Sequence, residues 1–213
     1  MNGLNKCLVV FVLICGGLIG LAADDSNRTI VFLGDSLAAG LGVEREEAFP
    51  SIIQRMIEKA GLPYRVLNAG FSGDTTAGGL RRLAWILKRK ADIFVLELGG
   101  NDGLRGLSPE GTEKNLKAII DRVRKGNPDV TIILAWMQMP QNMGVEYRTA
   151  FQSIFPSVAK EKEVLLIPFL LEGVGGVVEL NQADMIHPNV AGHLKVAENV
   201  WEVLAPLLVG EGE

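Results

Sequence analysis

Apolar and polar residues alternate along the chain in blocks that predict strands and helices by turns. Short apolar runs rich in β-branched residues are typical of buried strands, whereas apolar residues spaced three and four apart are typical of one face of a helix. By this criterion we expect strands at 30–33, 64–67, 93–98, 130–137 and 164–167. We expect helices at 49–60, 76–90, 108–125, 147–160 and 188–208, with Pro156 starting or kinking a turn.

This alternation predicts a single parallel sheet with helices on both faces. Strands that are apolar throughout must be covered on both sides, which is typical of α/β folds. We therefore expect an α/β fold with a five-stranded parallel sheet, in one domain from residue 23 to residue 213. The segment 169–186 lacks clear periodicity, and is either a lid or the connection that brings His187 to the sheet edge.

The first 22 residues are predicted to be a secretory signal peptide. Lys6 is followed by an uncharged, mostly apolar run and by the small residues Gly20-Leu21-Ala22, after which we expect cleavage. A retained membrane anchor is the alternative, but the run is shorter than the ~20 residues of a spanning helix. We therefore expect a periplasmic or secreted protein that has no stable membrane span after cleavage.

Composition narrows the possible chemistry. Both cysteines, Cys7 and Cys15, fall within the predicted signal peptide, so the mature chain has no disulfide, thiolate nucleophile or cysteine metal site. A formal net charge of −4 without a basic cluster argues against nucleic-acid binding. His187 and His193 are the only histidines, which leaves few possible zinc ligand sets. We expect no metal, no cofactor and a monomer.

Polar residues follow three of the predicted strands where each strand ends. Ser36 follows the first strand through Gly34, Gly73 follows the second, and Asn101 follows the third. The carboxyl ends of parallel strands share one edge of the sheet, where ligands bind in such folds. These three residues are therefore expected to lie together.

This group, together with Asp184 and His187 just before the last helix, predicts nucleophilic catalysis. A serine nucleophile needs a base, for which His187 is the obvious residue and His193 the only rival. Asp184 can hold the imidazole in one tautomer. The backbone N–H groups of Ser36 and Gly73, with the side-chain amide of Asn101, can form a three-donor oxyanion hole.

Each of these residues also has a structural interpretation. Asp184 and His187 could simply begin the last helix, with Pro188 in its first turn. Gly73 could be only a turn glycine, and 99–103 only a glycine-rich loop. His193 is expected to be a surface or packing residue. Glu97 is expected to be hydrogen-bonded near the loop, without a chemical role.

Four segments resemble the signature blocks of the SGNH (GDSL) hydrolases, in the same order along the chain. They are Gly34-Asp35-Ser36, Gly73-Asp74, Gly100-Asn101-Asp102 and Asp184-Met185-Ile186-His187-Pro188. Residues 68–75 and 97–106 further resemble the bacterial periplasmic thioesterase, lysophospholipase and arylesterase group of that family. The resemblance implies a flavodoxin-like three-layer α/β/α sandwich. It also implies Ser36 as nucleophile, Asp184 and His187 as its partners, and Gly73 and Asn101 as oxyanion donors.

The function implied by the resemblance is that of a serine esterase that forms an acyl-enzyme on Ser36. Its expected substrates are small molecules: aryl or acyl esters, lysophospholipids and acyl thioesters. A carbohydrate-ester deacetylase is the alternative. Three methionines within 137–144 favour an apolar acyl site, unless they only pack beneath a loop. Gly103 and Gly106 make 102–107 a candidate mobile loop over the site.

Overall fold

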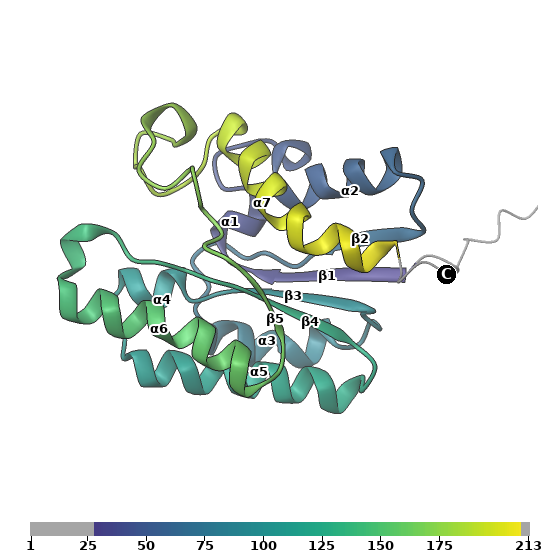
Figure 1. Ribbon diagram of the computed structural model, residues 1–213, viewed down its shortest axis with the longest axis horizontal. Coiled ribbons are helices and arrows are strands. Elements are labelled where there is room, and N and C mark those ends of the chain that lie inside the picture. Colours follow the sequence, from purple (N-terminus) through teal and green to yellow (C-terminus); the bar gives the residue numbers. More distant parts are fainter. Residues whose placement is uncertain (1–27, 210–213) are drawn as a thin grey trace, which may run out of the picture.

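The computed structural model describes residues 28–209 and contains one five-stranded parallel sheet (Figure 1). The strand order is β2-β1-β3-β4-β5. This is the strand order of flavodoxin-like folds, so the expected fold class is confirmed. The strands are β1 (Arg28–Gly34), β2 (Tyr64–Asn68), β3 (Ile93–Glu97), β4 (Thr131–Ala135) and β5 (Leu165–Ile167).

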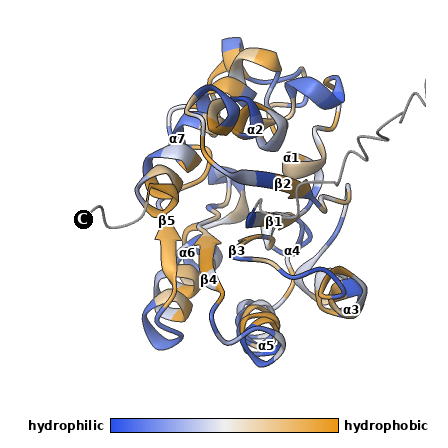
Figure 2. Ribbon diagram, turned by 90° about the vertical axis from the view of Figure 1, so that its right-hand side faces the viewer, coloured by the Kyte–Doolittle hydropathy of each residue, from blue (hydrophilic) through white to orange (hydrophobic). Residues whose placement is uncertain are grey.

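Helices cover both faces of this sheet, which makes three layers (Figures 1 and 2). Helices α2 and α7 pack together on one face, while α3, α5 and α6 pack side by side on the other. The helices are α1 (Ser36–Ala39), α2 (Phe49–Lys59), α3 (Thr76–Ile86), α4 (Gly100–Leu104), α5 (Pro109–Gly126), α6 (Val145–Glu161) and α7 (Val190–Leu208). Short 3₁₀ helices are η1 (Arg45–Glu47), η2 (Gln141–Met143) and η3 (Val178–Leu180).

The central strands are apolar because both of their faces are buried. Phe32 and Leu33 in β1 and Phe94 and Leu96 in β3 are fully buried between the helical layers. Removing such side chains from water is the main favourable term in folding. The edge strands β2 and β5 are only partly buried.

The register of β1 and β3 brings their carboxyl ends together. The two strands pair from Ile30 with Ile93 to Gly34 with Glu97. The chain runs from β1 outward to β2 and then returns to β3 on the other side of β1, so the strand order reverses between β1 and β3. The crevice at such a switch point is where open α/β sheets bind ligands. The residues that follow β1 and β3 are thus placed at this crevice.

Several helix boundaries differ from those expected. Helices α1 and α4 have four and five residues, too few for an apolar period to reveal them. Helix α7 begins at Val190 rather than Pro188, because the Asn189 side chain caps it by accepting a hydrogen bond from the Gly192 N–H at 3.1 Å. Helix α3 ends at Ile86 rather than Lys90.

The helix expected over 147–160 is confirmed as α6, which continues through Pro156. Proline removes one intrahelical hydrogen bond. The neighbouring Phe155 and Val158 are fully buried, and their burial holds this turn of the helix against the sheet.

The predicted signal peptide, residues 1–22, lies outside the described residues. Within residues 28–209, no helix is long and apolar enough to cross a membrane.

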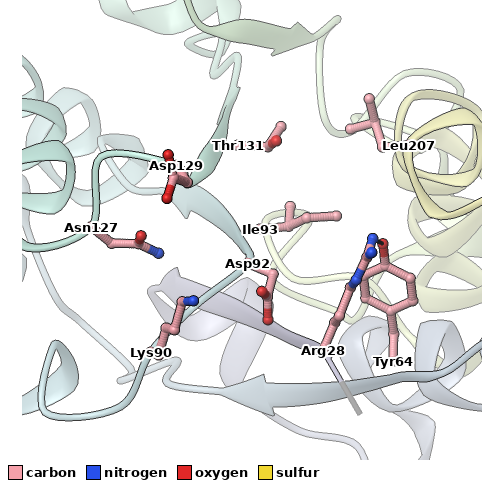
Figure 3. Close-up of a pocket in the computed structure, with 9 residues that line it drawn as sticks. All are labelled: Arg28, Tyr64, Lys90, Asp92, Ile93, Asn127, Asp129, Thr131 and Leu207. Carbon is pink, nitrogen blue, oxygen red and sulfur yellow. Dashed lines mark hydrogen bonds between the residues drawn. The ribbon is translucent and has the colours of Figure 1, made fainter. Parts of the chain in front are cut away.

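A cavity of about 290 Å³ opens at the amino-terminal edge of the sheet, opposite the crevice (Figure 3). It is lined by polar side chains at the starts of the strands, including Arg28, Asp92 and Thr131. Two of these are already engaged: Arg28 Nη1 donates to the Tyr64 hydroxyl at 2.9 Å, and Asp92 accepts from the Thr29 N–H at 2.7 Å. This cavity contains none of the residues expected to carry the chemistry.

Candidate active site

Ser36 lies at the carboxyl end of β1, as the first residue of helix α1, and is almost fully buried. Asp35 caps this helix, accepting a hydrogen bond from the Leu37 N–H at 3.0 Å. A Cβ at Gly34 would overlap the Glu97 carboxylate, so only glycine fits between this turn and β3. The sharp turn places the Ser36 hydroxyl at the crevice.

His187 connects Ser36 to Asp184. Its Nε2 lies 2.9 Å from Ser36 Oγ, and its Nδ1 lies 2.6 Å from Asp184 Oδ2. The other carboxylate oxygen, Asp184 Oδ1, accepts the N–H groups of Ile186 at 2.9 Å and His187 at 3.0 Å. The local turn therefore holds the carboxylate against the ring, and the order serine, histidine, aspartate is that of a hydrolase triad.

The surroundings of Asp184 keep it ionised. Burial would raise its pKa, but the N–H groups of His187 and Ile186 and the His187 ring outweigh burial and lower it to about 2. An ionised Asp184 can stabilise the imidazolium that forms when His187 takes a proton.

The segment before Asp184 acts as a connection that is tied to the crevice. Gln182 Nε2 donates to Leu41 O at 2.6 Å and to Pro188 O at 2.9 Å, and its N–H donates to His187 O at 2.8 Å. The buried Asn181 donates to Val174 O at 2.6 Å. Of the two interpretations offered by the sequence, these contacts favour the connection over a lid.

Gly73 occupies a tight turn in the loop that follows β2. The Asp74 N–H donates to Phe71 O at 3.0 Å, which closes the turn, and Gly73 has a φ of 80°. This positive φ at the third position of the turn favours glycine. Within residues 28–209, neither the N–H of Gly73 nor that of Ser36 donates to a protein acceptor. Both donors remain available to a ligand.

Asn101, on helix α4, is oriented by Asp35. Its Nδ2 donates to Asp35 Oδ2 at 3.1 Å. An amide nitrogen carries two N–H bonds, so one remains for a second acceptor. Burial raises the pKa of Asp35 to about 6, against the lowering effect of its bonds from Leu37 and Asn101.

Helix α4 includes residues 102–104, so only residues 105–107 of the expected mobile loop lie outside a helix. Residues up to Leu104 are helical, and Asp102 is buried. Its carboxylate accepts from the Thr76 N–H at 2.8 Å, and the Tyr147 hydroxyl donates to Leu107 O at 2.8 Å. These contacts join α4 to α3 and α6, so this stretch forms part of the support for Asn101.

Glu97 is fully buried behind the turn that carries Ser36, and its expected hydrogen bonding near the loop is confirmed. Its Oε2 accepts the N–H groups of Asp35 and Ala38, both at 3.2 Å, whereas Oε1 has no protein partner in the described part of the chain. Burial and the neighbouring Asp35 carboxyl raise the pKa of Glu97 well above its usual range. Glu97 therefore favours its protonated form, because burial and a neighbouring carboxylate both disfavour its charge.

His193 was expected to be a surface or packing residue, and it packs in the core. It is buried, stacks on Phe49 with ring centroids 6.3 Å apart, and its Nδ1 accepts the Phe49 N–H at 3.3 Å. Burial lowers its pKa to about 4. It is thus a neutral packing residue.

Of the two interpretations given for the three methionines within 137–144, the structure favours packing over an apolar acyl site, and Met143 is partly buried against the core. Met137 and Met139 are buried, and Met139 packs against Gly103 beneath α4. The exposed large apolar side chains closest in sequence to the site residues come from other segments: Phe71, Leu104, Met185 and Ile186.

Sequence reasoning also missed three residues that hold the site together. Asp35 orients Asn101, Arg105 donates to Gly73 O at 2.9 Å, and Arg82 bonds to several segments at once. Arg82 and Arg105 donate to backbone carbonyls, which leave no pattern in the sequence. The resembling segments Gly34-Asp35-Ser36 and 97–106 contain Asp35 and Arg105, whereas Arg82 lies outside all of them.

Comparison with known proteins identifies the class. A model of the GDSL-like lipase/acylhydrolase family matches residues 32–195, and the chain belongs to this family. It is 41% identical over 195 residues to the esterase TesA of Pseudomonas aeruginosa, covering 91% of this chain and 96% of that protein. It is 39% identical to thioesterase 1/protease 1/lysophospholipase L1 of Escherichia coli, covering 84% of this chain and 85% of that protein.

Solved structures agree with this assignment. A crystal structure of TesA superposes with a TM-score of 0.82 at 42% identity, covering 85% of this chain and all of that chain. The expected family, fold and serine ester hydrolase class are therefore confirmed.

Proposed function

We propose that this serine ester hydrolase cleaves aryl and acyl esters, lysophospholipids and acyl thioesters through an acyl-enzyme on Ser36. The observation that carries the proposal is the unbroken hydrogen-bonded chain from Ser36 Oγ through His187 to Asp184, with distances of 2.9 Å and 2.6 Å. A base within hydrogen-bond distance of a serine, itself oriented by a third group, is the arrangement that activates a serine nucleophile.

In the acylation half of the reaction, His187 Nε2 takes the Ser36 proton as Oγ attacks the carbonyl carbon. The resulting oxyanion accepts hydrogen bonds from the N–H groups of Ser36 and Gly73 and from the free N–H of the Asn101 amide. His187 then gives its proton to the leaving alcohol or thiol. Water, deprotonated by His187, attacks the acyl carbon, and Ser36 leaves as the acid is released.

The acyl preference rests on exposed apolar side chains close in sequence to the site residues. Phe71 precedes Gly73 by two positions, Leu104 lies on the same helix as Asn101, and Ile186 adjoins His187. These side chains can cover the chain of a bound acyl group. Moving one methylene from water into an apolar site is favourable by about 0.8 kcal/mol of transfer free energy. If two additional methylenes are buried in the transition state, kcat/KM should therefore rise by roughly tenfold.

The test is a panel of aryl acetates, aryl butyrates, acyl thioesters, lysophospholipids and acetylated xylose. We expect a butyrate ester to have a kcat/KM roughly tenfold above its acetate. If the highest kcat/KM instead belongs to acetyl groups on sugars, the enzyme is a carbohydrate-ester deacetylase and the acyl proposal is wrong.

Asn101→Ala is expected to lower kcat by about 10²–10³-fold with little change in KM, because its donor bond strengthens as the oxyanion develops. The measurement is kcat, KM and Tm on an ester for which acylation is rate-limiting. A folded variant with normal kcat would remove Asn101 from the mechanism and leave Ser36 and Gly73 as donors.

We also propose that the protein is exported and cleaved after Ala22, because its amino-terminal pattern of a basic end, an apolar run and small residues is typical of a secretory signal peptide. Amino-terminal sequencing of the protein expressed in a Gram-negative host is expected to begin at Ala23. A chain that retains Met1 in the membrane fraction would instead indicate an anchor.

A further inference from the structure

We infer that Arg82 is a positioning residue that fixes the Ser36 turn and the Gly73 turn relative to each other, and so aims two of the oxyanion donors. This inference rests on the proposed acyl-enzyme mechanism. It concerns a residue on helix α3 that lies beneath both turns and touches no reacting atom.

The guanidinium of Arg82 bonds to three separate segments. Its Nη2 donates to Gly34 O at 3.0 Å, at the end of β1, and its Nη1 donates to Ala69 O at 2.7 Å, just after β2. Its Nε donates to Asp74 Oδ2 at 2.6 Å, in an ion pair. One side chain thus joins the ends of two neighbouring strands and the loop that follows the second.

Each of these contacts lies close in sequence to an oxyanion donor. Gly34 precedes Ser36 by two residues, and Asp74 directly follows Gly73. Asp74 also closes the Gly73 turn through its own N–H bond to Phe71 O at 3.0 Å. The Phe71 N–H in turn donates to Gly34 O at 3.0 Å. Both turns are therefore tied to the same guanidinium and to each other.

Burial makes these bonds strong. The Asp74 side chain is 8% exposed and that of Arg82 is 25% exposed, so water competes little for the ion pair. Hydrogen bonds between charged groups are shorter and roughly twice as strong as those between neutral ones. An arginine offers five N–H donors in a rigid plane, whereas a lysine offers a single mobile ammonium. The three directed bonds therefore require arginine.

Gly73 is also held from its other side. Arg105, at the end of α4, donates to Gly73 O at 2.9 Å. This carbonyl belongs to the peptide between Gly73 and Asp74, whereas Arg82 bonds to the side chain of Asp74. Both guanidinium groups restrict the Gly73 turn. Of the two, only Arg82 also bonds to β1, the strand that precedes Ser36.

A misplaced donor reduces the stabilisation of the transition state more than that of the bound substrate, because the hydrogen bonds to the oxyanion reach full strength only in the transition state. A shift of about 1 Å in a catalytic group can cost about 10² in rate. We therefore expect Arg82→Ala to lower kcat by about 10²-fold and Arg82→Lys by about tenfold, each with KM within about threefold of the wild type.

The experiment measures kcat, KM and Tm for these variants on an ester for which acylation is rate-limiting, at a temperature below every Tm. Arg81→Ala is the matched control, because Arg81 is the exposed neighbour on the same helix and carries the same charge. Arg81→Ala should keep the wild-type kcat. If Arg82→Ala does not fold, Arg82→Lys decides the result.

The inference is wrong if folded Arg82 variants keep a kcat within about twofold of the wild type, even when Tm falls, or if only KM changes. Phosphonate labelling of the wild-type enzyme separates this outcome from failure of the mechanism. A wild type that is labelled on Ser36 while the Arg82 variants remain fully active would reject the role of Arg82 and leave the acyl-enzyme intact.

Discussion

Replacing His187 with alanine is expected to lower kcat by roughly 10³-fold or more, leaving only binding and oxyanion stabilisation. The reason is that His187 Nε2 is the proton acceptor 2.9 Å from Ser36 Oγ, and the described chain contains only one other histidine. Without the imidazole, the Ser36 hydroxyl must lose its proton to water. The measurement is kcat on an aryl ester, with Tm as the check on folding.

His193→Asn is the matched control for this experiment. Asparagine can keep an acceptor close to the position of His193 Nδ1, which bonds to the Phe49 N–H. We expect a lower Tm, because the stacked contact with Phe49 is lost, and a kcat close to that of the wild type. If His193→Asn reduces kcat more than His187→Ala does, the assignment of the base is wrong.

Replacing Ser36 with alanine is expected to have the largest effect, a loss in kcat on the order of 10⁶-fold, as when other serine hydrolases lose the nucleophile. No acyl-enzyme can form without Ser36 Oγ, and the remaining donors can act only on direct attack by water. The fold should persist, because the side-chain bond from Ser36 reaches only His187.

The control for Ser36→Ala is Ser157→Ala, at an exposed serine on α6 away from the crevice. It should leave kcat unchanged. Hydrolysis by Ser36→Ala at a rate within about tenfold of the wild type would contradict a serine nucleophile at this position.

The architecture was predictable because its physical cause is visible in the sequence. The apolar runs around Phe32 and Phe94 predict strands that are buried on both faces, and a parallel sheet then places the residues after β1 and β3 at one edge. That Ser36 and Asn101 are neighbours follows from topology alone. The return of His187 to the same edge depended on the long connection, which carries no period of its own.

Other features could not be predicted, because they depend on tertiary contacts rather than on the periodicity of apolar residues along the sequence. Helices α1 and α4 are shorter than two turns, and caps and glycine turns define them. Met139 was expected either to line an apolar acyl site or to pack beneath a loop, and it fills the space under Gly103. Arg82 bonds mainly to backbone carbonyls. Because every residue has a carbonyl, the sequence does not indicate which ones an arginine will contact.

The most direct test of the central claim is mass spectrometry of the enzyme after inactivation with an aryl alkylphosphonate. The phosphorus centre reacts with an activated serine and leaves a stable adduct that resembles the tetrahedral intermediate. We expect one adduct, on the peptide that contains Ser36, formed in step with the loss of activity and absent from Ser36→Ala. Inactivation with the adduct on any other residue would contradict the central claim.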